Sequence, residues 1–348
     1  MKTQTREDEG FMKDGFQAKV ARSASIILAN WPTQQRNHAL REMADLLSSK
    51  SSIDFLIEAN QRDLSSNPHL APGLKQRLVL SESKIHTLIA GIRQIAELPD
   101  PLNKVHINRQ LADQLYLCKH TVPIGVIAVI FESRPDVMAQ IVPLSLKTGN
   151  AVVLKGGKEA YNTNEAFFQL FQKLTFLPEG WCSLLQGREQ VDHLLAQTKD
   201  IDLVIPRGSR DLILHVMNNT KIPVLGHADG VCHIYVGADI DMAQALDVIE
   251  DANTQYPAAC NSVETVLVDG AIADSFLPIL IQKLTSKQVE LFGCEKVRAI
   301  HPDLPPAMDW TLEFGGLKLN IKIVENMDEA IDHINTYGSH HTDCILSQ

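Results

Sequence analysis

The order of apolar runs and helical patterns from residue 122 onward is the strongest constraint on the fold of this chain. Residues 125–131 (GVIAVIF) are apolar throughout, as a strand buried on both faces requires. Helical spacing follows in residues 137–146. The alternation then predicts strands at 151–154, 181–185, 201–205 and 222–225 and helices around 167–171, 191–195 and 212–217, the first of them capped by Asn162 or Asn164. Such β-α-β order predicts an α/β fold with a doubly wound parallel sheet, whose ligands bind at the carboxyl ends of the strands.

A second α/β unit is expected from residue 226 onward. It contains predicted strands at 233–236, 263–268, 317–324 and 344–346 and predicted helices at 242–252 (capped by Asp241), 273–284 and 327–334. The first hundred residues show helical periodicity, with Thr33 as a candidate cap and with Pro99 and Pro101 ending the last helix. Residues 105–121 alternate loosely, which predicts an extended arm or a hairpin. The polar first ten residues are expected to be disordered.

Composition excludes several classes of protein. The chain has 348 residues, 45% hydrophobic and 21% charged, which is ordinary for a globular protein long enough for two domains. Its net charge of -10 argues against a general nucleic-acid binder, and its longest apolar run is too short to span a membrane. The six cysteines lack metal-binding or disulfide-framework spacing, which favours a reducing compartment. The adjacent His340 and His341 point apart, so no metal site is expected.

One cysteine lies in a loop where a substrate could reach it. Residues 255–265 (QYPAACNSVET) place Cys260 between a helical stretch and a predicted strand, and Pro257 interrupts both. An accessible thiol in such a loop is a candidate nucleophile. The alternative is a cysteine that only fills space, because free cysteine is among the most buried residue types.

Three further motifs could bind anions at strand ends. KGGK (155–158) and RGS (207–209) each follow a strand and open a helix, so they either hold a phosphate or are plain turns with solvated cations. No GxGxxG motif is present. In ESRPD (132–136), Arg134 could clamp a carboxylate or phosphate, or could pair with a neighbouring acid. His227 is either a proton donor or a structural histidine.

Longer motifs together resemble the gamma-glutamyl phosphate reductase family, within the aldehyde dehydrogenase-like superfamily. The resemblance covers nearly the whole chain and rests on RQIAELPDP (93–101), VPIGVIAVIFESRPDV (122–137), GGKEA (156–160), IPRG (205–208), YPAACN (256–261) and YGSHHTD (337–343). It implies a cofactor-binding domain of residues 1–104 and 122–225, an oligomerisation arm of residues 105–121, and a catalytic domain of residues 226–348.

The resemblance also implies an activity and a set of site residues. The activity is the NADPH-dependent reduction of L-glutamyl 5-phosphate to L-glutamate 5-semialdehyde in proline biosynthesis, through a thioester on Cys260 and with release of phosphate. Substrate or oxyanion contacts are implied for Ser133, Arg134 and Asn261. Cofactor contacts are implied for Lys155, Lys158, Arg207, Gly208, Ser209 and Glu313.

By the same resemblance, we expect a cytoplasmic homo-oligomer that could receive its substrate by channelling from glutamate 5-kinase. Members of the family continue past the segment matched by residues 343–348, so the catalytic domain is expected to be incomplete and the chain as given to be poorly active and prone to self-association. One alternative is a truncated, weakly active or non-catalytic paralogue. Another is an ordinary aldehyde dehydrogenase, whose thioester-hydrolysing glutamate would fall at Gly226, where this chain has no carboxylate.

Overall fold

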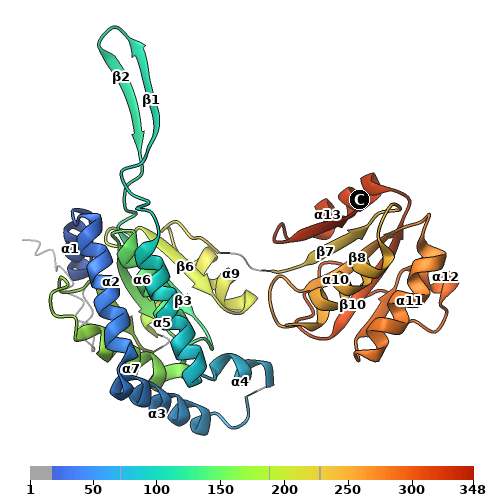
Figure 1. Cartoon of the computed structure of the whole chain (residues 1–348), viewed down its shortest axis with the longest axis horizontal. Coiled ribbons are helices and arrows are strands. Elements are labelled where there is room, and N and C mark those ends of the chain that lie inside the picture. Colours follow the sequence, from blue (N-terminus) through green and yellow to red (C-terminus); the bar gives the residue numbers. More distant parts are fainter. Residues whose placement is uncertain (1–17, 71, 188, 227–228) are drawn as a thin grey trace, which may run out of the picture. The chain divides into compact units, whose positions relative to one another are not determined.

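Each of the two structural units of the chain contains its own parallel sheet and its own hydrophobic core. The computed structural model describes residues 18–70, 72–187, 189–226 and 229–348, so the first ten residues lie outside the described part. The chain divides into units of residues 1–226 and 227–348 (Figure 1). The buried apolar side chains form separate clusters within the two units. The prediction of an α/β fold with parallel sheets is confirmed.

The first unit is a four-stranded parallel sheet covered by helices. Its strand order is β5-β4-β3-β6, and β3 (Val126–Phe131) is buried at every residue because helices and neighbouring strands surround it. The other strands are β4 (Ala151–Lys155), β5 (Cys182–Leu185) and β6 (Leu203–Arg207). The helices are α1 (Ala18–Ala29), α2 (Thr33–Ser48), α3 (Lys50–Ser66), α4 (Pro72–Leu78), α5 (Glu82–Glu97), α6 (Asp136–Lys147), α7 (Tyr161–Gln172), α8 (Glu189–Leu195) and α9 (Arg210–Asn218).

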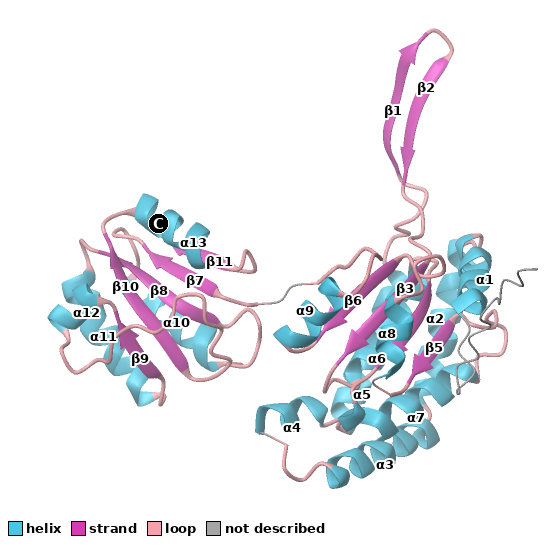
Figure 2. Cartoon of the chain, turned by 180° about the vertical axis from the view of Figure 1, so that it is seen from behind, coloured by secondary structure: helices cyan, strands magenta, loops and turns pink. Residues whose placement is uncertain are grey.

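A two-stranded hairpin projects from the first unit, as Figure 2 shows. Strands β1 (Val105–Ala112) and β2 (Leu115–His120) pair antiparallel, and every residue of both strands is exposed. The loose alternation of residues 105–121 therefore corresponds to a hairpin that buries no apolar side chain within this unit.

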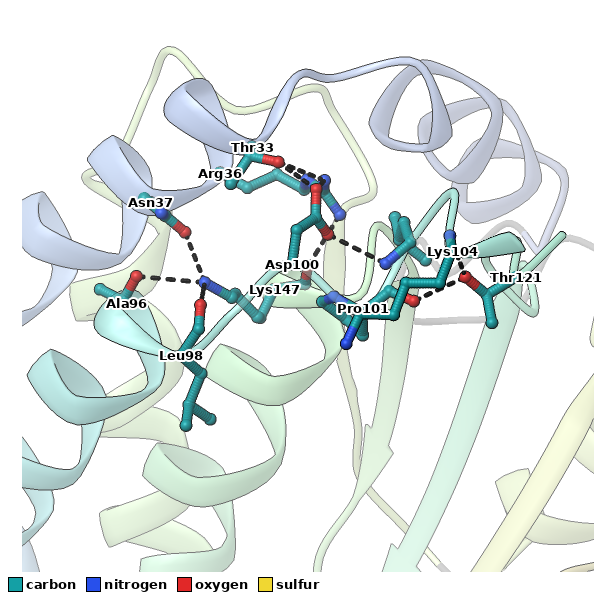
Figure 3. A network of polar contacts seen from close by, with 11 residues as sticks. Thr33, Arg36, Asn37, Ala96, Leu98, Asp100, Pro101, Lys104, Thr121 and Lys147 are labelled. Carbon is teal, nitrogen blue, oxygen red and sulfur yellow. Dashed lines mark hydrogen bonds and ion pairs between the residues drawn. The ribbon is translucent and has the colours of Figure 1, made fainter. Parts of the chain in front are cut away.

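The buried Lys147 connects α6 to α2 and to the end of α5, near the base of this hairpin (Figure 3). The Lys147 ammonium, at the end of α6, donates hydrogen bonds to the carbonyl oxygens of Ala96 (3.1 Å) and Leu98 (2.7 Å) and to the Asn37 side chain (2.8 Å). Burial lowers the pKa of Lys147. The lysine thus supplies donors for carbonyl groups at the end of α5 that have no partner within that helix.

A second set of contacts orders the chain between α5 and the hairpin. The Arg36 guanidinium, only 2% exposed, reaches the Asp100 carboxylate at 2.7 Å, and Thr33 donates to the same carboxylate. Burial acts to raise the pKa of Asp100, but these hydrogen bonds, a backbone amide and the charge of Arg36 together lower it. Thr121 donates to the Pro101 carbonyl at 2.7 Å. The prediction that Thr33 caps its helix is wrong, because it is the first residue of α2 and its hydroxyl binds Asp100.

The second unit is a five-stranded parallel sheet in the order β11-β7-β8-β10-β9. Its central strand β8 (Val263–Asp269) is buried along its whole length. The predicted cap Asp241 is confirmed, since its carboxylate accepts hydrogen bonds from two amides in the first turn of α10. The remaining elements are β7 (Cys232–Val236), β9 (Glu290–Gly293), β10 (Lys318–Val324), β11 (Asp343–Leu346), α10 (Met242–Thr254), α11 (Ala273–Ser286), α12 (Glu295–Ile300) and α13 (Met327–Tyr337).

The structure corrects two further local predictions. Residues 222–225 make only an isolated bridge, from Val224 to Val204, because Pro223 has no N–H to extend a ladder. Asn162 and Asn164 do not cap α7, since both lie inside it. The Asp63 carboxylate, on α3, instead accepts hydrogen bonds from the backbone amides of Asn162 (2.9 Å) and Thr163 (2.8 Å) in the first turn of α7.

Candidate active site

A cavity of about 890 Å³ lies at the carboxyl edge of the first unit's sheet. Its wall includes residues that follow the ends of β3, β4 and β5 and residues of the first turns of α9, among them Glu132, Gly156, Gly157, Gln186, Gly187 and Ser209. Parallel α/β sheets bind ligands at this edge. The volume lies within the range of small-molecule and cofactor sites.

Two lysines of the KGGK motif line this cavity. Lys155 ends β4 and is half-buried, whereas Lys158 is exposed and opens a short 3-10 helix. The carboxylates of Asp192 and Asp211 also line the cavity. Lysine side chains bind phosphate groups, whereas carboxylates accept hydrogen bonds from hydroxyl groups. The arrangement therefore suits a ligand that carries both phosphate and hydroxyl groups.

The RGS motif contributes Ser209 to the same cavity. Ser209 caps α9, where its hydroxyl oxygen accepts from the Leu212 N–H, and its own N–H donates to the Glu132 carboxylate at 2.8 Å. A Cβ at Gly208 would lie too close to that carboxylate oxygen, so the Glu132 side chain would have to move. Arg207 is exposed at the end of β6 and is not among the described residues that line the cavity.

Ser133 is held by a carboxylate that sequence reasoning missed. Its N–H (2.5 Å) and its hydroxyl (2.9 Å) both donate to one oxygen of Glu159, which lines the cavity. Ser133 has a φ of 48°, a left-handed conformation that is costly for a non-glycine residue. Glu159 therefore stabilises the left-handed conformation of Ser133 in the turn after β3.

Arg134 follows Ser133 and is half-buried. The two acids considered as its alternative partners are engaged by other residues: Glu132 accepts from Ser209, and Asp136 lies 3.8 Å from the Lys84 ammonium. In the described part of the chain, neither acid is paired with Arg134.

Cys260 is exposed in a turn that connects α10 to β8. The turn is ordered by backbone hydrogen bonds from Ala259 to Tyr256 (2.9 Å) and from Ser262 to Ala259 (3.0 Å). By contrast, Cys232 is buried, and burial raises the pKa of its thiol to about 12. Cys260 is therefore not a core residue, and its neighbour Asn261 is exposed as well.

Gly230 links Glu313 to the Cys260 turn, because it contacts both. The Glu313 carboxylate accepts a hydrogen bond from the Gly230 N–H at 2.9 Å. Gly230 is buried, and a Cβ there would collide with the Cys260 carbonyl. The Cys232 thiol donates to that carbonyl oxygen at 3.3 Å. Gly230 and Cys232 belong to no recognisable motif, so the sequence alone did not indicate them.

Glu264 is a buried acid four residues after Cys260. It is 2% exposed, one oxygen lies 3.5 Å from the Gly315 amide, and the other oxygen has no hydrogen-bond partner among the described residues. Burial raises its pKa to about 8; the Gly315 and Phe314 amides lower it, and the charge of Glu313 raises it further. Burial thus favours the protonated form of the Glu264 carboxyl near neutral pH. The sequence signal was a single acid within the apolar run 263–268.

The predicted site residues thus divide between the two units. The first unit holds Ser133, Arg134, Lys155, Lys158, Arg207, Gly208 and Ser209, and the second holds Cys260, Asn261 and Glu313. His227 lies outside the described residues. Across residues 18–70, 72–187, 189–226 and 229–348, no cluster of three or more acidic, His or Cys side chains could hold a metal, and no helix is long and apolar enough to cross a membrane.

Known proteins resemble this chain in both sequence and structure. The profile of the aldehyde dehydrogenase family matches residues 16–292. Gamma-glutamyl phosphate reductase of Pelotomaculum thermopropionicum is 46% identical over 337 residues, which are 95% of this chain and 77% of that protein. Gamma-glutamyl phosphate reductase 1 of Synechocystis is 44% identical over 336 residues, 94% of this chain and 77% of that protein.

A solved structure gives the same result. The crystal structure of gamma-glutamyl phosphate reductase from Thermotoga maritima matches with a TM-score of 0.89 and 35% identity, covering 95% of this chain and 82% of that one. The chain therefore belongs to the aldehyde dehydrogenase family and, within it, to the gamma-glutamyl phosphate reductases.

Proposed function

We propose that this chain reduces L-glutamyl 5-phosphate to L-glutamate 5-semialdehyde, with release of phosphate, as a step of proline biosynthesis. Relatives that carry the name of this activity match 95% of the chain at 46% identity. The observation that carries the proposal is the exposed Cys260, in a turn whose carbonyl is bonded by Cys232 and packed against Gly230.

In the proposed reaction Cys260 is the nucleophile. Its thiolate attacks the γ-carbonyl carbon, a C–S bond forms, the C–O bond to phosphate breaks, and phosphate leaves with the electron pair. Phosphate is a stable anion, so its departure needs no strong acid. The negative charge on the tetrahedral oxygen is the costly one, and backbone amides near Cys260 together with Asn261 or Ser133 would stabilise it. Arg134 is the proposed clamp for an anionic group of the substrate.

The proposed cofactor is NADPH. When bound, it supplies the hydride that converts the thioester to the aldehyde, with uptake of one proton and return of the Cys260 thiol. Lys155 and Lys158 would hold the ribose and its 2'-phosphate, and Arg207, Gly208 and Ser209 would lie along the pyrophosphate. Glu313 would accept from the nicotinamide ribose. The 890 Å³ cavity supports this assignment for Lys155, Lys158 and Ser209, which line it.

The decisive experiment is the reverse reaction, NADP-dependent oxidation of glutamate semialdehyde with phosphate added. The Cys260→Ala variant should lose this activity by many orders of magnitude, because no other group replaces an essential nucleophile. The Cys118→Ala variant is the matched control, since Cys118 is also exposed but lies on β2 of the hairpin. Substantial activity in Cys260→Ala, or loss in Cys118→Ala, would contradict the proposal.

We further propose that the hairpin β1–β2 pairs with a second copy of this chain. All of its residues are exposed, including the apolar Val105, Leu111, Leu115 and Leu117. Strand edges with unpaired backbone groups and apolar side chains favour pairing with another chain. Light scattering of the intact chain tests this, and a strictly monomeric protein would contradict it.

A further inference from the structure

Residues 313–315 are held in place at three points, all within the second unit. The Glu313 carboxylate accepts from the Gly230 N–H at 2.9 Å. The Phe314 ring stacks on Phe292 of β9, with ring centres 5.9 Å apart. The Gly315 N–H faces the Glu264 carboxyl of β8 at 3.5 Å.

The third of these contacts links the segment to the strand that follows the Cys260 turn. Gly315 has a φ of 59°, and a Cβ built on it would meet no atom within 4 Å. The space on that side of Gly315 is open, and its N–H contact with the Glu264 carboxyl, at 3.5 Å, links the residue to the sheet. Because Gly230 packs against the Cys260 carbonyl, a shift of residues 313–315 would also release the amide beside that turn.

We propose that Glu264 is a positioning residue: its carboxyl holds residues 313–315 so that the Glu313 carboxylate stays on the Gly230 amide beside Cys260. The inference rests on the proposed function only in treating Cys260 and Glu313 as the acting residues. Glu264 itself takes no part in bond making or breaking.

The ionisation state of the Glu264 carboxyl affects this hold, because the Gly315 and Phe314 amides favour the carboxylate whereas the charge of Glu313 opposes it. Two titratable groups are coupled to Glu264 electrostatically. The charge of Glu313, in the segment that Glu264 contacts, raises the pKa of Glu264, and the charge of Glu264 raises the pKa of the Cys232 thiol on β7. Both groups are anions when ionised, and among the described residues no cation is a source of the shifted pKa of Glu264, about 8. Ionised Glu264 would repel Glu313 and at the same time bind the Gly315 and Phe314 amides more strongly, so the position of Glu313 against Gly230 should change as the pH rises through about 8.

One test needs neither substrate nor cofactor. It records the chemical shift of the Gly230 amide by NMR, as a function of pH, in protein labelled with ¹⁵N-glycine. The measurement is made in the Cys260→Ala background, so that ionisation of that thiol does not contribute. The Gly230 resonance is identified by its change in Glu313→Gln. It should shift with a midpoint near pH 8, and it should be independent of pH between 7 and 9.5 when Glu264→Gln is added. Glu290→Gln, an exposed acid on β9, is the matched control and should keep the transition. Absence of the transition, or its persistence in Glu264→Gln, would overturn the proposal.

A second measurement compares activity with Cys260 restored. Glutamine keeps the size and one acceptor oxygen of the neutral carboxyl, so Glu264→Gln should keep kcat/KM within about threefold at pH 7. It should also lack any change in kcat/KM that accompanies ionisation of Glu264 near pH 8 in the unmutated protein. Glu264→Ala removes the carboxyl that the Gly315 and Phe314 amides contact, and kcat/KM should fall about tenfold or more.

Loss of activity in Glu264→Gln at pH 7, with the Gly230 resonance unchanged, would make Glu264 a proton donor and overturn the positioning role. An active Cys260→Ala protein would instead refute the proposed function, while the NMR titration would still decide the role of Glu264.

Discussion

The absence of a side chain at residue 230 allows two backbone segments to meet beside Cys260. We predict that Gly230→Ala lowers kcat/KM by about 100-fold or more, because a shift of about 1 Å in a reacting group can cost this much. The added Cβ would displace the Cys260 carbonyl. Gly270→Ala is the control, since its Cβ would make only ordinary contacts, the nearest at 3.4 Å. Equal activity in the two variants would argue against a constrained Cys260 turn.

Lys158 should decide the choice between the two nicotinamide cofactors. A charge-assisted contact to the 2'-phosphate is worth about 1.5–3 kcal/mol, so Lys158→Ala should weaken NADPH binding roughly ten- to a hundredfold. NADH binding and the maximal rate should change little. Lys173→Ala is the control, an exposed lysine after α7 that is not among the described residues lining the cavity. Fluorescence titration with both cofactors provides the measurement, and equal use of both by the unmutated protein would refute the role.

At the residue scale, short motifs could be recognised from sequence but contacts between distant segments could not. Pro257 and the residues around Cys260 predict an exposed loop, and the structure has one. The hold of Glu159 on Ser133 and of Glu313 on Gly230 joins residues 26 and 83 positions apart. No periodicity or local propensity encodes such pairs.

At the element scale, the Lys147 network should contribute measurably to the stability of the first unit. We predict that Lys147→Met lowers the free energy of unfolding by about 1–3 kcal/mol, because removing the ammonium leaves buried carbonyl oxygens without a donor. The unmutated lysine bonds two such carbonyls and the Asn37 side chain. Urea unfolding of Lys147→Met and of the exposed control Lys173→Met tests this. An equally small effect in both would show that water replaces the lost donors.

The strongly patterned elements were the predictable ones. The apolar run at β3 became a strand buried at every residue, as its composition required, and β8 is buried throughout although it carries Glu264, Thr265 and Asp269. Predictions were wrong where a contact between distant segments decides the local structure. For example, Asp63 of α3 caps α7, whereas the sequence favoured Asn162 as the cap. Strand β9 had only four residues with an exposed first position, too short a pattern to stand out from a loop.

At the scale of the whole molecule, each unit has its own core, so a buried group in one unit affects stability mainly through that unit. Glu264 is such a group in the second unit, and its burial makes the folded state less stable at higher pH. A carboxyl with a raised folded-state pKa keeps a proton that the unfolded chain has already released. Stability therefore falls as pH rises between the unfolded pKa of 4.5 and the folded pKa of about 8.

This pH dependence gives a stability prediction that does not depend on activity. Glu264→Gln removes the titrating group, so the variant's free energy of unfolding should rise relative to that of the unmutated chain as pH increases. The slope should approach about 1.4 kcal/mol per pH unit between pH 5 and 8 and flatten above. His333, whose pKa burial lowers to about 3, titrates equally in both proteins and cancels in the difference. Urea unfolding at several pH values, with Glu290→Gln as the exposed control, measures the slope. A difference that stays constant with pH would mean that Glu264 is ionised in the folded protein, and both its buried neutral state and its pH-dependent hold on residues 313–315 would then be wrong.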